Sequence, residues 1–214
     1  MDAVIFDLDG VLVDSETVWD ATRRAVVAEH GGTWTEQASR ALMGMSTPEW
    51  ARYLVDELGA RLTAERAAEV VVDRMAERYA AGPPVLPGAV EVVRAVGRDY
   101  PVAIASSSPP VLIDAFLDAT GLADLVGVAL SSEEVGAGKP EPDVYLEAAN
   151  RLGVAPRDCV AVEDSTNGLR SALAAGMTVV AVPNPHFPPE VDVLARAGSV
   201  LNEVSELPTT LTTL

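Results

Sequence analysis

Five short apolar runs, rich in valine, alanine and isoleucine, constrain the fold of this chain more than any other feature. They are continuous rather than alternating, which is typical of strands covered on both faces of a parallel sheet. The runs span residues 3–6, 102–105, 127–130, 159–162 and 178–182, and helical patterns begin between them at Gly88, Pro109, Pro142 and Asn167. Strands and helices that alternate in this way predict an α/β fold with a Rossmann-like, doubly wound parallel sheet.

Residues 16–81 interrupt this alternation. The segment contains four helical patterns and no convincing strand, and the Pro/Gly-rich stretch from Ala80 to Gly88 follows it. We therefore expect residues 1–15 and 82–214 to form the α/β core domain. Residues 16–81 are expected to form an all-helical cap domain, inserted after the first strand and lying over whatever site that strand builds.

The charge of the chain limits its partners. It has 15 basic and 32 acidic residues and a formal net charge of -17, which would repel a nucleic-acid backbone or an anionic membrane surface. There is no apolar stretch of membrane-spanning length and no basic, apolar leader, and the single cysteine, Cys159, cannot form an intrachain disulfide. We expect a cytoplasmic protein with a small-molecule ligand and no nucleic-acid or membrane partner. Nothing demands a partner protein, so we expect a monomer and leave an oligomer open.

Polar residues follow the apolar runs, where ligands bind in an open parallel sheet. These residues are Asp7 and Asp9 after the first run, Ser106, Ser107 and Ser108 after the second, Lys139 in the loop after the third, and Glu163 and Asp164 after the fourth. Carboxylates from two strands suit Mg²⁺, whereas lysine, serine hydroxyls and backbone N–H groups suit a phosphate. Asp7 and Asp9 project to the same side of an extended chain, so one can act as nucleophile and the other as proton donor and acceptor.

Each of these residues alone also has a purely structural explanation. The serines could cap the helix that begins at Pro109, Lys139 could be a solvated loop residue, and Asp164 and Ser165 could cap the next helix. Asp7 is harder to explain in this way, because a carboxylate at a buried strand end is costly unless a cation neutralises it. Taken together, the residues predict one site.

Four stretches carry a resemblance to a known family: "FDLDGVLVDSE" from Phe6, "ASSS" from Ala105, "GKPEPDVY" from Gly138 and "VEDSTNG" from Val162. In order and spacing they resemble the four motifs of the haloacid dehalogenase superfamily of phosphotransferases. The helical insertion resembles the small cap of the subgroup that contains hexitol and deoxyhexose phosphatases and β-phosphoglucomutase. The true dehalogenases lack the second aspartate, so Asp9 counts against that branch.

The resemblance implies a role for each residue. Asp7 would attack the phosphorus and form an aspartyl-phosphate, and Asp9 would protonate the leaving alcohol and then activate water. The cofactor would be Mg²⁺. The implied phosphate-binding groups are Ser106, the backbone of Ser107 and Lys139, and the implied metal ligands are Asp7, the carbonyl of Asp9, Asp164 and Glu163, the last directly or through water.

We therefore expect a Mg²⁺-dependent phosphatase that acts on a small phosphorylated metabolite, a sugar or polyol phosphate. A sugar phosphomutase is one alternative. The β-phosphoglucomutases of this subgroup have a cap histidine at the position of Trp19 and a cap arginine near Thr47, and this sequence departs from that pattern at both positions. A phospho-accepting signalling module is another, since receiver domains also combine strand-end acids, magnesium and a lysine; the cap and Asp9 count against it.

Three cap residues are candidates for contact with the substrate. Trp19 either packs the lid or stacks on a sugar ring. The stretch "MGMST" from Met43 matches the cap loop that reaches the site in this subgroup, and its candidates are Gly44 and Thr47. Trp50 and Arg74 are expected in cap packing and at the surface, and residues 183–190 as a rigid loop rather than part of a site.

Overall fold

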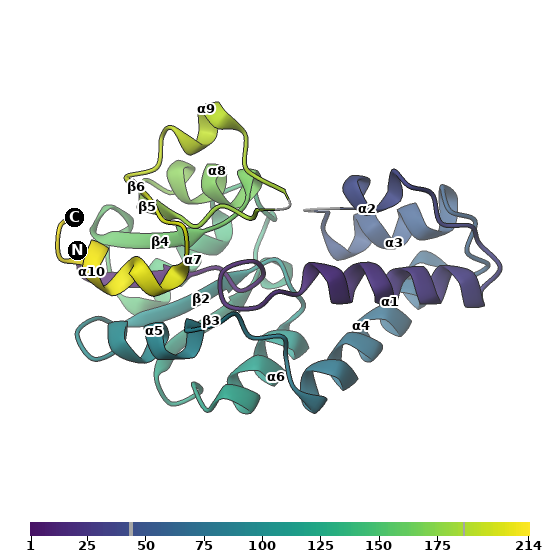
Figure 1. Ribbon diagram of the computed structural model, residues 1–214, viewed down its shortest axis with the longest axis horizontal. Helices are drawn as coiled ribbons and strands as arrows, with labels where there is room; N and C mark the ends of the chain where they lie inside the picture. The colour runs from purple at the N-terminus through teal and green to yellow at the C-terminus, as the bar shows by residue number, and fades with distance from the viewer. Residues whose placement is uncertain (43–44, 186) are drawn as a thin grey trace.

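A six-stranded parallel sheet forms the centre of the structure, a computed structural model that describes residues 1–42, 45–185 and 187–214 (Figure 1). The strand order is β3-β2-β1-β4-β5-β6, and every pair is parallel. The strands are β1 (Ala3–Phe6), β2 (Val102–Ser106), β3 (Val126–Ser131), β4 (Cys159–Glu163), β5 (Thr178–Ala181) and β6 (Ser199–Val200). The order reverses at β1, which places the ends of β1, β2 and β4 side by side at the point where such sheets bind ligands.

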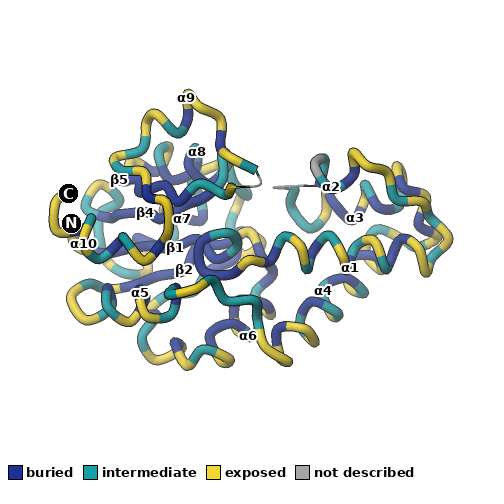
Figure 2. Tube along the Cα trace, viewed as in Figure 1, coloured by how far each residue is buried: buried dark blue, intermediate teal, exposed yellow. Residues whose placement is uncertain are grey.

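The apolar runs are continuous because both faces of the sheet are covered. In β1, Val4 and Phe6 pack into one hydrophobic cluster and Ala3 and Ile5 into another, and all four are fully buried (Figure 2). Helices α5 (Ala89–Val96) and α6 (Pro110–Thr120) contribute to the first cluster, and α7 (Asp143–Leu152) and α8 (Thr166–Ala174) to the second. The α/β fold expected from the sequence is confirmed.

Helices alone make up the regular structure described between Glu16 and Ala81. They are α1 (Glu16–Glu29), α2 (Ala38–Ala41), α3 (Thr47–Asp56) and α4 (Ala64–Ala81). Local signals set their starts: Ser46 and Glu49 form a capping box before α3, and the Thr63 side chain accepts a hydrogen bond from the Arg66 backbone before α4. Figure 1 shows these helices together beyond the carboxyl ends of the central strands. The division into core and cap at residues 15 and 82 stays a prediction.

Several short elements are absent from the sequence prediction. They are β6, α9 (Val191–Leu194), α10 (Leu207–Leu211) and the 3₁₀ helices η1 (Ser132–Glu134), η2 (Pro156–Asp158) and η3 (Val204–Glu206). All are five residues or shorter, too short for a hydrophobic period to reveal. Residues 183–190 form no helix or strand where they are described.

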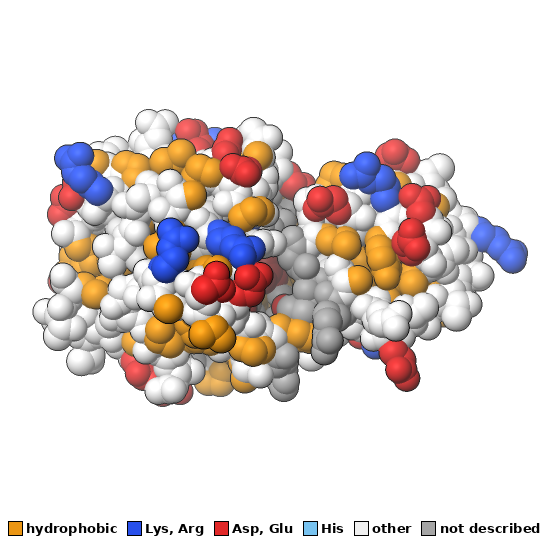
Figure 3. All heavy atoms as spheres, turned by 90° about the horizontal axis from the view of Figure 1, so that it is seen from above, with side chains coloured by type: hydrophobic (Ala, Val, Ile, Leu, Met, Phe, Trp, Pro, Cys, Tyr) orange, Lys and Arg blue, Asp and Glu red, His pale blue; other side chains and the backbone are white. Residues whose placement is uncertain are grey.

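On the face shown in Figure 3, acidic and basic side chains are interspersed with hydrophobic ones. Among the described helices, none is both long and apolar enough to cross a membrane. One basic side chain, Lys139, is buried at the carboxyl ends of the strands, where it could meet an anionic ligand.

Candidate active site

Lys139 joins the ends of three strands. Its Nζ donates to Asp7 Oδ1 at 2.8 Å, to the Ala105 carbonyl at 3.0 Å and to Glu163 Oε1 at 2.6 Å. Burial lowers the pKa of Lys139, but the carboxylates of Asp7 and Glu163 outweigh burial and raise that pKa above its ordinary value. The side chain is therefore a fixed ammonium and not a solvated loop lysine.

Glu163 accepts hydrogen bonds from several donors besides Lys139. Its Oε1 also accepts from the Tyr145 hydroxyl at 2.7 Å, and its Oε2 accepts from the backbone N–H of Asp164 at 3.1 Å. The Ser165 hydroxyl donates to Oε2 at 3.3 Å, and Ser165 also caps α8 by accepting from the Gly168 N–H. Both oxygens of Glu163 thus have donors, so its clearest effect is to position Lys139.

Three buried carboxylates lie together beside this lysine. Oxygens of Asp7, Glu163 and Asp164 are within 4.8 Å of one another. Burial raises the pKa of Asp7 to about 8, and Lys139 offsets only part of that rise. Burial, with Glu163 and Asp7, also raises the pKa of Asp164 well above its usual range. Hard oxygen ligands that repel one another in this way fit a divalent cation such as Mg²⁺, which would let them ionise together.

The Asp9 side chain is not one of these three carboxylates and is oriented by hydroxyl groups. Its Oδ2 accepts from Ser108 Oγ at 2.6 Å and from Ser106 Oγ at 3.3 Å, and its Oδ1 accepts a short hydrogen bond from Ser15. The Ser106 hydroxyl also accepts from the Ser108 backbone N–H at 3.0 Å. The alternative that these serines cap α6 is wrong, because its N-cap has no side-chain hydrogen bond. Ser106 and Ser108 donate to Asp9 instead.

Two glycines permit the close approach of the acidic groups. A Cβ on Gly10, whose φ is +80°, would lie 1.9 Å from Asp164 Oδ2, and a Cβ on Gly168 would lie 1.9 Å from Glu163 Oε1. Any other residue would displace one of the two carboxylates. Gly10 is thus required both for the turn after the first strand and for the position of Asp164.

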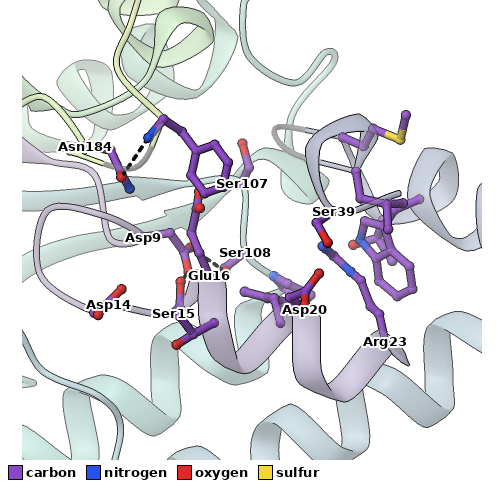
Figure 4. Close-up of a pocket in the computed structure, with 18 residues that line it drawn as sticks. Asp9, Asp14, Ser15, Glu16, Asp20, Arg23, Ser39, Ser107, Ser108 and Asn184 are labelled. Atoms are coloured by element: carbon purple, nitrogen blue, oxygen red, sulfur yellow. Dashed lines mark hydrogen bonds between the residues drawn. The ribbon is translucent and has the colours of Figure 1, made fainter. Parts of the chain in front are cut away.

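A cavity of about 480 Å³ opens between Asp9 and the cap (Figure 4). It is lined by Asp9, Asp14, Ser15, Glu16, Thr17, Trp19, Asp20, Arg23, Ser39, Leu42, Met45, Thr47, Trp50, Ser107, Ser108, Pro109, Asn184 and Phe187. Of the predicted site residues, Asp9, Ser107, Trp19 and Thr47 lie in this lining. Gly44 lies outside the described residues.

Comparison with known proteins decides the family. Residues 1–176 match the haloacid dehalogenase-like hydrolases. The chain belongs to this family. Hexitol phosphatase B of Escherichia coli (strain K12) is 34% identical over 189 residues, which cover 86% of this chain and 84% of that protein. The bifunctional riboflavin kinase/FMN phosphatase of Arabidopsis thaliana is 30% identical over 215 residues, 95% of this chain, but the match spans only 54% of that protein.

A solved structure of similar shape holds a phosphate. CbbY from Rhodobacter sphaeroides in complex with phosphate has a TM-score of 0.86 and 28% identity, and the match covers 97% of this chain and 96% of that one. The fold and family that the four motifs predict are confirmed, and this haloacid dehalogenase-like hydrolase is an enzyme whose curated relatives named above are phosphatases.

On the side of the cavity formed by α1 and α3 lies Arg23, which the sequence did not single out. The Arg23 guanidinium carbon lies 4.7 Å from the centre of the Trp19 ring and 4.9 Å from that of Trp50, and the two ring centres are 6.0 Å apart. Burial lowers the pKa of Arg23 to about 10, so it stays charged at neutral pH. Arg74, by contrast, pairs with Glu29 at 2.6 Å and is not in the lining of this hydrolase's cavity.

The opposite side of the cavity also includes Asn184 and Phe187, from the loop expected to be rigid rather than part of a site. No local pattern marks these two residues. The Pro-rich composition of residues 183–190 predicts only a rigid loop after β5.

Proposed function

We propose that this protein is a Mg²⁺-dependent phosphatase that hydrolyses a small phosphorylated metabolite, a sugar or polyol phosphate, through an aspartyl-phosphate on Asp7. The observation that carries the proposal is the Asp7–Lys139 pair, set among buried carboxylates beside a cavity that Asp9 lines. The likeness to hexitol phosphatase B supports the substrate class. The lone cysteine, Cys159, supports a cytoplasmic location, and we propose a monomer.

In the first step a carboxylate oxygen of Asp7 attacks the phosphorus, and the bond from phosphorus to the leaving oxygen breaks. Asp9 gives its proton to that oxygen, and an alcohol departs. In the second step water attacks the phosphorus and gives its proton to Asp9. The bond between phosphorus and Asp7 then breaks, which releases phosphate and restores both carboxyl groups.

The remaining residues position these groups. Asp7 and Asp164, with the Asp9 carbonyl and Glu163 nearby, would hold Mg²⁺, which when bound supplies positive charge toward the phosphoryl oxygens. Lys139, the Ser107 backbone and the Ser106 hydroxyl would hold those oxygens as well. The Ser15 and Ser108 hydroxyls, which donate to Asp9, fix the orientation of its carboxyl group.

The phosphatase is favoured over the two alternatives by particular residues. Trp19 and Thr47 line the cavity where the mutase pattern has a histidine and an arginine. A signalling module needs a long-lived phospho-aspartate, whereas Asp9, which lines the cavity, would activate water to hydrolyse it. A hexose 1-phosphate given with a trace of its bisphosphate should yield free phosphate and no isomer.

The proposal is tested by phosphate release from p-nitrophenyl phosphate, with Mg²⁺ and with chelator. Asp7→Asn should lose at least about a thousandfold in kcat while keeping its circular dichroism, because the nucleophile is gone. Asp2→Asn, an exposed aspartate just before β1, is the matched control and should keep full activity. Substantial turnover by Asp7→Asn, or a wild-type rate that chelator leaves unchanged, would contradict the proposal.

A further inference from the structure

Two polar side chains of α1 point into the cavity with unused hydrogen-bonding capacity. Nε of Arg23 and Oδ1 of Asp20 are buried, and neither has a hydrogen-bond partner among the described residues. Both residues line the cavity, as Figure 4 shows. They are three residues apart and so share one face of the helix. A buried donor and a buried acceptor left open side by side are costly unless a ligand completes them.

Neighbouring side chains fix both groups in place. The other oxygen of Asp20 accepts from Arg24 Nε at 2.5 Å, and Arg24 in turn donates to Ser39 Oγ at 3.0 Å. The Arg23 guanidinium packs against the Trp19 and Trp50 rings, which leaves the N–H groups on its edge for a ligand. The pair is therefore preorganised and needs little ordering when a ligand binds.

The surrounding charge selects an uncharged ligand. Asp9, Asp20 and Glu16 line the same cavity as Arg23 and act on it electrostatically, so three carboxylates share this cavity with one guanidinium. A second phosphate or a carboxylate on the substrate would meet more negative than positive charge here. A hydroxyl can donate to Asp20 Oδ1, and its neighbour can accept from Arg23, while the carbon face of the same molecule packs on an indole ring.

We infer that Arg23 and Asp20 determine the specificity for the leaving group, and that this group is an uncharged polyol or sugar with neighbouring hydroxyls. The inference rests on the proposed phosphatase activity and adds the residues that read the alcohol. A hydrogen bond between a hydroxyl and a charged group, made inside such a cavity, changes kcat/KM by about tenfold or more. Because these contacts lie away from the phosphorus, most of the change is expected in KM.

The test compares hexose and hexitol phosphates, sorbitol 6-phosphate among them, with hexyl phosphate, which has the same carbon number and no hydroxyls. The wild type should prefer the best of the hydroxylated esters by about tenfold or more in kcat/KM. Arg23→Gln and Asp20→Asn should each remove most of that preference, mainly through KM. Arg66→Gln, an exposed cap arginine that pairs with Glu69, is the matched control and should keep the preference.

Several results would overturn this inference. One is a wild type that prefers none of the hydroxylated esters to hexyl phosphate, and another is an unchanged preference in both variants. A third is a preference for fructose 1,6-bisphosphate that Arg23→Gln removes, since Arg23 would then read an anion. Asp20→Asn leaves the stacked arginine in place, so it tests the pair even if Arg23→Gln does not fold. In each case continued release of phosphate from p-nitrophenyl phosphate shows that the proposed phosphatase still stands.

Discussion

Lys139 Nζ donates to Asp7 Oδ1 at 2.8 Å, although 132 residues separate the two in the chain. Their side chains are only 6% and 9% exposed. The contact joins the end of β1 to the loop after β3. It brings the buried ammonium of Lys139 into hydrogen-bonding contact with the proposed nucleophile. The same lysine also holds Glu163, so stability and chemistry depend on one charge.

Lys139→Met should therefore destabilise the fold strongly. Removal of the ammonium leaves Asp7 and Glu163 buried without it, and breaking a buried pair in this way costs about 3–5 kcal/mol. Arg157→Met is the control, since Arg157 is 82% exposed and lies 3.7 Å from Asp158, and it should cost about 1 kcal/mol or less. Urea unfolding measures both. Equal losses would show that the buried ammonium is not needed.

Gly10→Ala should weaken Mg²⁺ binding by displacing Asp164. Gly176 has nearly the same φ, +79° against +80°, but a Cβ there would meet nothing within 4 Å. Both alanine variants should lose about 1–2 kcal/mol of stability from the left-handed backbone. Only Gly10→Ala should also need a higher Mg²⁺ concentration for half-maximal activity. A matching shift in Gly176→Ala would assign the effect to backbone strain.

Cys159 should react slowly with thiol reagents in the folded protein. Burial, with Asp158 and Asp2, raises the pKa of its thiol from 9.0 to about 11, and the residue is 1% exposed. The raised pKa lowers the thiolate fraction roughly hundredfold at any pH below both values. Because only the thiolate reacts, the alkylation rate falls with it. The alkylation rate should keep rising with pH up to about 11. In urea it should level off near 9, and a native profile that levels off there too would contradict this prediction.

The core of the site was predictable because the chemistry lies at strand ends. Asp7, Asp9, Glu163 and Asp164 directly follow apolar runs, and parallel strands bring such positions to one edge whatever the rest of the chain does. Lys139 follows the third run only after a loop, where a solvated lysine is the ordinary alternative, and its burial appears only in the structure.

The cavity wall was not predictable in the same way. Arg23, Asp20 and Trp50 sit on amphipathic cap helices, where the same spacing equally describes packing or a solvated face. Which face meets the substrate depends on how α1 and α3 lie against the core, and that follows from tertiary contacts rather than local pattern. Asn184 and Phe187 line the cavity from a loop, and they too are placed there by tertiary contacts that no local pattern reveals.

The most direct test of the central claim is a burst experiment with Asp9→Asn and p-nitrophenyl phosphate. Nitrophenolate is a good leaving group that needs little help from a proton donor, so Asp7 should still be phosphorylated while water attack on the intermediate is slowed. We predict a rapid release of about one nitrophenolate per chain, and mass spectrometry should find a phosphoryl group on the peptide that contains Asp7. Steady turnover with no burst and no phosphorylated Asp7 would contradict the account.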